Sequence, residues 1–174
     1  MTQEAYTNEL DKMRDLELKL FIIEFNKASQ LDRSISKNPR KPKSEFRKAL
    51  VDTCLALIKK MDEGALSNDE IRKKIKSLSE KYGVSCGQAQ KVVNVCLKQY
   101  MFLTRNYQCA KELDCPLDTT TMKGCKIAHR RMCSVNAGDY ELYQGLFEKE
   151  NGLRIFKDEA YDNQRIENFF KGEK

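Results

Sequence analysis

The sequence has 174 residues, of which 40% are hydrophobic and 33% are charged, and its formal net charge is +6. This length and hydrophobic content predict one domain, residues 1–174, with a core of its own. No run approaches 18 apolar residues, which argues against a transmembrane helix, and the first residues lack the basic-then-apolar order of a secretory signal. We therefore expect a cytoplasmic protein, in which the seven cysteines, an odd number, stay reduced.

The charge is unevenly distributed along the chain. Residues 31–131 carry 22 basic and 11 acidic side chains, whereas residues 1–30 and 132–174 each have a small acidic excess. A basic middle region can bind a polyanion such as nucleic acid. Lysine-rich helices that face only solvent have the same composition, so both interpretations stay open.

Helical periodicity dominates the chain from its start. Residues 4–28 place four apolar side chains on one stripe, which predicts a helix with that stripe in the core. Residues 31–43 have two prolines, five basic residues and no periodicity, and are expected to form an exposed connector. Another helix is expected over residues 44–63. The first stripe consists of Met13, Leu16, Leu20 and Ile23, and the second of Phe46, Leu50, Cys54, Leu57 or Ile58, and Met61.

Residues 67–103 are expected to form a helical hairpin. Ser67 and Glu70 have the spacing of a capping box, in which each side chain accepts the other residue's backbone N–H. Gly83 is expected to end the first helix and Ser85 to begin the second. No heptad run in the chain is long enough to predict a coiled coil. The buried stripe of the first helix is expected to contain Ile71, Ile75, Leu78 and Tyr82.

The pattern weakens in residues 106–135, which contain four cysteines and are expected to be irregular. Asp114–Pro116 resembles the start of a short helix, and residues 124–133 are a second helical candidate. Better periodicity predicts helices over residues 136–150 and 159–171. The sequence therefore predicts an all-α fold, a compact bundle of five to seven helices that includes the hairpin.

The hairpin has the features of a helix-turn-helix that reads nucleic acid. Gly83 lies in the turn, Ser79 is the small residue that lets the helices pack closely, and Val84 fills the turn. Gln and Asn on the second helix can bind adenine edges, and Lys can bind guanine or phosphate. Two core helices joined by a tight turn would look the same, and DNA and RNA are not distinguished. Contacts are predicted for Arg40, Lys41, Lys43, Lys73, Lys74, Gln88, Lys91, Asn94 and Lys98.

Gly87 is the unusual residue of the second helix. A glycine inside a helix costs about 1 kcal/mol relative to alanine, so its presence needs a reason. We expect the backbone at Gly87 to approach either a ligand or another helix closely.

Two short stretches carry a resemblance to known proteins. The residues AQKVVNVCLK (Ala89–Lys98) and CPLD (Cys115–Asp118) are similar to a group of small, all-helical prokaryotic and phage proteins of unassigned function. The resemblance covers about the middle third of the chain. It implies an all-helical fold and no particular chemistry.

The only histidine lies near three cysteines, in the order Cys109, Cys115, Cys125 and His129. Zinc takes four tetrahedral nitrogen or sulfur ligands, and Cys-x3-His is a familiar half of such a site. The intervening loop lengths are unusual, however, and cysteines elsewhere in the chain occupy apolar stripes. Buried or incidental cysteines are therefore the preferred interpretation, and no cofactor is expected.

No motif for catalysis is present. The sequence contains no Walker A, dinucleotide-binding or HExxH pattern, and nothing orients a Cys–His nucleophile pair. We expect a protein that is not an enzyme. The preferred hypothesis is a nucleic-acid-binding protein that uses the basic hairpin. The alternative is a protein-interaction module, for example a phage-encoded inhibitor or adaptor.

Overall fold

The computed structural model describes residues 3–28, 43–125, 127, 131–149 and 152–172, which form seven α-helices and three short 3-10 helices without a strand. The prediction of an all-α bundle of five to seven helices is confirmed. None of the described helices is long and apolar enough to cross a membrane. The helices are α1 (Gln3–Ala28), α3 (Lys43–Asp62), α4 (Asn68–Tyr82), α5 (Cys86–Thr104), η1 (Ala110–Glu112), α6 (Thr119–Gly124), η2 (Met132–Ser134), α7 (Ala137–Glu148), η3 (Arg154–Phe156) and α8 (Glu159–Lys171).

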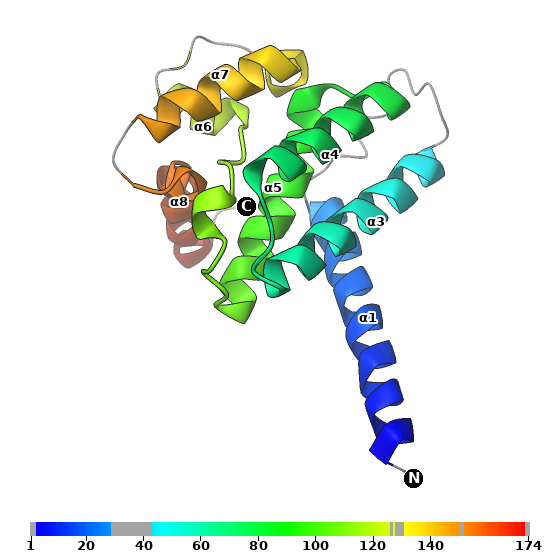
Figure 1. Ribbon diagram of the computed structural model, residues 1–174. Coiled ribbons are helices and arrows are strands. Elements are labelled where there is room, and N and C mark those ends of the chain that lie inside the picture. The colour runs from blue at the N-terminus through cyan, green and yellow to red at the C-terminus, as the bar shows by residue number, and fades with distance from the viewer. Residues whose placement is uncertain (1–2, 29–42, 126, 128–130, 150–151, 173–174) are drawn as a thin grey trace.

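Helix α5 lies at the centre of the molecule and contacts α1, α3, α4, α7 and η2 (Figure 1). Its buried apolar residues, among them Ala89, Val93, Leu97 and Met101, share one side of the helix, yet the other side is largely buried as well. A helix buried on all sides is normally apolar throughout. Helix α5 also buries four polar side chains. The elements that supply their partners cover this side of the helix. The four side chains are Gln88, Gln90, Asn94 and Lys98.

The predicted helices and turn of the hairpin are present. The Ser67 hydroxyl accepts the Glu70 N–H at 3.4 Å, and Gly83, with a φ of 68°, ends α4 by donating its N–H to the Ser79 carbonyl at 2.9 Å. The predicted capping box is only half formed, because the Glu70 carboxylate pairs with Lys60 of α3 at 2.6 Å. All predicted core positions of α3 and α4 are buried: Phe46, Leu50, Cys54, Leu57, Ile58, Met61, Ile71, Ile75, Leu78 and Tyr82.

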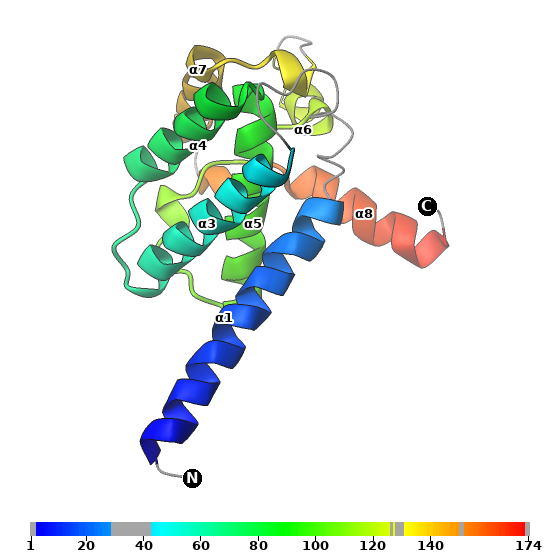
Figure 2. The same cartoon turned by 90° about the vertical axis from the view of Figure 1, so that its right-hand side faces the viewer.

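Helix α1 differs from the prediction, because the stripe expected in the core is exposed. The helix packs on α3 and α5 through its opposite face, where Ile22 is fully buried and Leu18 and Phe21 are partly buried. Its N-terminal half extends beyond the rest of the molecule (Figures 1 and 2). Apolar residues occur on both sides of α1, so periodicity alone did not determine which side packs. The exposed fractions are 66% for Met13, 57% for Leu16, 52% for Leu20 and 40% for Ile23.

The described part of residues 106–135 contains only the short helices η1, α6 and η2. The predicted helix start at Asp114–Pro116 is wrong. Helix α6 begins at Thr119, because the Asp118 carboxylate accepts the Thr121 N–H at 2.8 Å and so caps the helix.

Residues 113–118 have no regular secondary structure, yet all six are buried in the middle of the molecule. The predicted helix over residues 124–133 is also not observed in its described part, where α6 ends at Gly124 and only the 3-10 helix η2 follows. A buried irregular segment needs partners for its backbone N–H and C=O groups. Those partners are the polar side chains of the neighbouring helices.

The two C-terminal helices are found where the sequence predicts them. Helix α7 begins after Asn136, whose side chain forms a capping box with Asp139. Helix α8 leaves the body of the molecule, and its C-terminal end is clear of the other elements (Figure 2). Three apolar residues of α8 are accordingly exposed, at 54% for Ile166, 79% for Phe169 and 80% for Phe170.

Candidate interaction surfaces

The side chains of α5 that were predicted to read nucleic acid do not form an exposed face. Gln88, Asn94 and Lys98 are 7%, 1% and 2% exposed, and Lys91 is half-buried. The expectation that this face is open is therefore wrong. Residues 113–118, α7 and the start of α8 supply partners for Lys91, Asn94 and Lys98, and Gln88 pairs with Ser85. Contact with a groove would require the buried side chains to leave the core.

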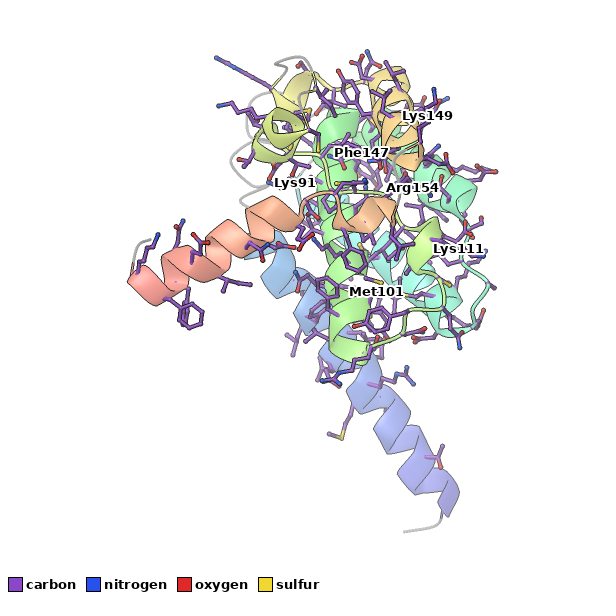
Figure 3. The ribbon with its side chains drawn as sticks, turned by 90° about the vertical axis from the view of Figure 1, so that its left-hand side faces the viewer. Lys91, Met101, Lys111, Phe147, Lys149 and Arg154 are labelled. Atoms are coloured by element: carbon purple, nitrogen blue, oxygen red, sulfur yellow. The ribbon has the colours of Figure 1, made fainter. Side chains whose placement is uncertain are left out.

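Gln88 and Lys91 have partners near the start of α5. The Gln88 amide oxygen accepts the Ser85 N–H at 2.9 Å, and the Ser85 hydroxyl accepts the Gln88 N–H at 3.1 Å, which completes a capping box. Lys91, labelled in Figure 3, pairs at 3.3 Å with Asp118, the residue that caps α6. The Lys91–Asp118 pair links the start of α6 to α5.

Two buried glutamines hold residues 113–118 in the core. Gln90 donates to the Leu117 carbonyl at 2.6 Å and accepts the Leu117 N–H at 3.1 Å. Gln144 of α7 repeats this arrangement on Cys115, with distances of 2.8 and 3.0 Å. Each amide group replaces the paired backbone hydrogen bonds that a neighbouring strand would supply. The buried backbone N–H and C=O groups of Cys115 and Leu117 are satisfied in this way although the segment is not in a sheet.

Asp114 is the charged centre of this segment and is fully buried. It accepts hydrogen bonds from Arg72 at 2.9 Å, Asn68 at 2.9 Å and Tyr140 at 2.8 Å. The Nε of Arg154, which is labelled in Figure 3, lies 3.0 Å from the Asp114 carboxylate. Burial raises the pKa of Tyr140 well above its usual value, and the negative charge of Asp114 raises it further, so the phenol stays a donor. The carboxylate therefore connects α4, α7 and η3.

Asn94 connects the hydrogen bonds of Gln90 with the hydrogen bonds around Asp114. Its amide nitrogen donates to the Tyr140 hydroxyl at 2.8 Å and to the Gln90 amide oxygen at 3.2 Å. A side chain used in this way organises the core and is not available to a base edge.

Lys98 fastens α8 to α5. Its ammonium group pairs with Asp158 at 2.6 Å and with Asp162, and only 3% of the Lys98 side chain is exposed. Burial alone would lower the pKa of Lys98, but the hydrogen bonds to the two carboxylates outweigh it and the pKa is raised. Burial raises the pKa of Asp158 although Lys98 opposes this. The pair is therefore a structural link between two helices.

Gly87 has the close contact that its position predicted. A Cβ atom there would lie 1.9 Å from the Met132 carbonyl oxygen and 2.9 Å from the Val135 Cβ. The Gly87 N–H also donates to the Val135 carbonyl at 3.0 Å. A glycine is thus required at position 87 because η2 and Val135 pack directly against the backbone of α5 there.

The cysteines considered as zinc ligands each contact a different carbonyl group. Cys109 donates to Met61, Cys115 to Pro116 and Cys125 to Lys157, at 3.8–3.9 Å. His129 lies outside the described residues. Within the described part of the chain, no three His, Cys, Asp or Glu side chains form a group that could hold a metal ion.

The basic residues predicted on α4 are exposed. Lys73 and Lys74 lie on its surface, and Lys76 is exposed on the same helix. Glu80 is exposed among them, so this face is basic but mixed. Arg40 and Lys41 of the predicted connector, and the side chain of Lys43, lie outside the described part of the structure.

The most unusual surfaces are the apolar faces of α1 and α8. On α8 the Phe169 and Phe170 rings lie edge to face, with centroids 5.8 Å apart, at the end that projects from the body. Single exposed apolar residues are common, but several on one helix face are typical of a binding surface. The sequence showed the apolar stripe of α1 but predicted that it would lie in the core.

No protein-family model, curated protein or solved structure matches the chain. The resemblance of residues 89–98 and 115–118 to small prokaryotic and phage proteins therefore stays a prediction. The expectation that the chain is not an enzyme also stays a prediction.

Proposed function

We infer that the protein is an interaction module that binds other protein chains through the exposed apolar faces of α1 and α8. The observation that carries this proposal is that both helices project from a well-packed body while presenting large apolar side chains to solvent. These side chains are Met13, Leu16, Leu20 and Ile23 on α1, and Ile166, Phe169 and Phe170 on α8.

The energetics favour burial of these faces in a complex. Full burial of one leucine or phenylalanine side chain contributes about 1.5–3 kcal/mol. Aromatic residues are also enriched at the centres of protein interfaces, where a few side chains supply most of the affinity. Phe169 and Phe170 are thus suited to be the anchors of the α8 face.

The fold also holds α8 ready for a partner. Lys98 fixes the first turn of the helix through Asp158 and Asp162, whereas the two phenylalanines lie at the opposite end. A binding helix that is already formed loses less conformational entropy on association than one that folds on its partner.

Affinity capture with matched variants tests this function. The full chain, the variant F169S/F170S and the control N163S/E167Q on exposed polar positions of α8 are used to capture proteins from cell extract. A captured protein is then purified and its binding to all three chains is measured by calorimetry. We expect equal binding by wild type and control and about tenfold or more weaker binding by F169S/F170S. Equal affinity for all three chains would contradict a role for this face.

Nucleic-acid binding is a second candidate, supported by the exposed lysines of α4. Lys73, Lys74 and Lys76 could contact phosphates without any side chain leaving the core. Fluorescence anisotropy with labelled duplex and single strands at low salt tests it. We expect log K to fall linearly with log salt, with a slope reduced by about 0.7–0.9 for each phosphate-contacting lysine that is replaced. No binding at low salt would eliminate this function.

A further inference from the structure

The exposed residues of α1 have the spacing of a coiled-coil seam. Met13, Leu16, Leu20 and Ile23 follow one another at intervals of three, four and three residues, as a and d positions do. At 100° per residue they cover one narrow stripe of the helix. Ile22 and its neighbours on the packed face lie on the opposite side, so the stripe is available while α1 stays bound to the body.

The charges beside this stripe differ between its two edges. Lys12 and Lys19 occupy the g positions along one edge, and Glu17 occupies the e position along the other. Lys12 and Glu17 are both exposed. In a parallel pair of helices, a g residue faces the e residue five positions later on the partner, which brings Lys12 to Glu17 in both directions. An antiparallel pair would instead set g residues against g residues and e residues against e residues, so that like charges would meet.

We propose that the apolar face of α1 binds α1 of a second copy of this chain, in a parallel two-stranded pairing with Lys12–Glu17 contacts across it. This inference rests on the proposed function, since it names the partner of one of the two binding faces. The pairing joins two bodies that lie on opposite sides of the α1 seam.

The seam has only two heptads, too short a run to predict a coiled coil from the sequence alone, and this limits the strength of the pairing. Isolated helices of this length are marginal because nucleation is unfavourable. Here α1 is already held as a helix by Ile22 and the contacts with α3 and α5, so pairing does not have to form it. Four apolar side chains per helix still make a small interface. The dimer is therefore weak and reversible, and it forms as the protein concentration rises.

Sedimentation equilibrium of the full chain tests the pairing. Wild type is expected to shift from monomer to dimer between micromolar and millimolar concentrations. L16E/L20E should remain monomeric with an unchanged circular dichroism spectrum, because both leucines are already exposed. The control F169S/F170S should dimerise like wild type. A wild-type chain that stays monomeric, or a dimer that L16E/L20E leaves intact, would overturn the inference.

Charge reversal tests the parallel orientation. E17K and K12E should each weaken the dimer by about tenfold, since each replaces two attractive contacts by repulsive ones, and the swap K12E/E17K should restore it. In a C133S background, M13C should form an intermolecular disulfide under mild oxidation, because an a position lies beside itself only in a parallel pair. Single reversals without effect would overturn the parallel pairing.

The same variants separate this inference from the proposed function. If wild type is monomeric but a captured protein binds it and not L16E/L20E, α1 binds a different chain. The second-copy pairing is then wrong while the interaction function holds. If neither association nor capture depends on α1 or α8, both are wrong.

Discussion

Helix α5 buries polar side chains, whereas helix α1 exposes apolar ones. Both differ from the usual pattern of buried apolar and exposed polar residues, but for different reasons. On α5 the reason lies inside the molecule, because Gln90 and Asn94 satisfy a buried segment and its neighbours. On α1 no described element covers the stripe that contains Leu16 and Leu20, and the proposed pairing with a second chain would account for it. A polar residue on a helix thus indicates a binding face only if its side chain is exposed and has no partner within the molecule. An apolar residue indicates a core position only if another element packs against it.

The largest expected change in the free energy of unfolding comes from a buried polar residue of α5, Lys98. Lys98→Met leaves the carboxylates of Asp158 and Asp162 without their cation, and should lower the free energy of unfolding by about 3–5 kcal/mol. Lys91→Met is the matched control, since Lys91 is partly exposed and should cost at most about 1 kcal/mol. Urea denaturation of both variants measures the difference. Equal, small losses would show that Lys98 is not a structural cation.

The contribution of Lys98 should also depend on pH. Its pKa in the folded protein is raised above the ordinary value of 10.5, so its stabilisation is fully present below pH 10.5 and is lost as pH rises through the higher folded value. The stability difference between wild type and Lys98→Met should therefore shrink in alkaline solution. Denaturation at neutral pH and above pH 10.5 measures it. A difference that grows with alkalinity would contradict this ion pair.

Substitution of Gly87, on the same helix, should destabilise the protein by a smaller amount. Gly87→Ala places a Cβ against the Met132 carbonyl and should destabilise the protein by about 1–3 kcal/mol through overpacking. Gly145→Ala in α7 is the control, because nothing lies within 4 Å of its Cβ position, and it should stabilise by about 0.5–1 kcal/mol. Thermal denaturation compares the two. Stabilisation by both substitutions would mean that η2 does not pack against α5 as described.

The smallest effect is expected on the exposed side of α1. Leu20→Ala should change the free energy of unfolding of the monomer by no more than about 0.5 kcal/mol. Ile22→Ala, on the packed face two residues later, should cost about 2–4 kcal/mol because it removes a fully buried side chain. Denaturation at low protein concentration makes this comparison. If Leu20→Ala were the more damaging, the two faces of α1 would be assigned the wrong way round.

Most of the helices could be predicted from the sequence, because local signals define them. Ser67 and Gly83 mark the ends of α4, and apolar periodicity marks its core face. The burial of Gln90 and Gln144 could not be predicted, because it depends on Leu117 and Cys115, which are distant in sequence. A local pattern shows that a polar residue lies on an apolar helix, but not that an irregular segment packs beside it.

The candidate surfaces were predictable only in part. The lysines of α4 were identified and are exposed, since a strong apolar stripe on the same helix fixes which side faces water. Lys98 is also a lysine but is buried, because Asp158 and Asp162, which are 60 or more residues later in the sequence, pair with it. On α1 two apolar faces competed, and the choice between them depended on contacts with α3 and α5.

Amide hydrogen exchange at two protein concentrations is the most direct test of the claim that the apolar face of α1 binds a second chain. The amides from Met13 to Ile23 should exchange more slowly at high concentration, where the dimer forms, and those of α4 should exchange at the same rate at both. The L16E/L20E variant should show no such dependence. Exchange in α1 that is identical at low and high concentration would contradict the account.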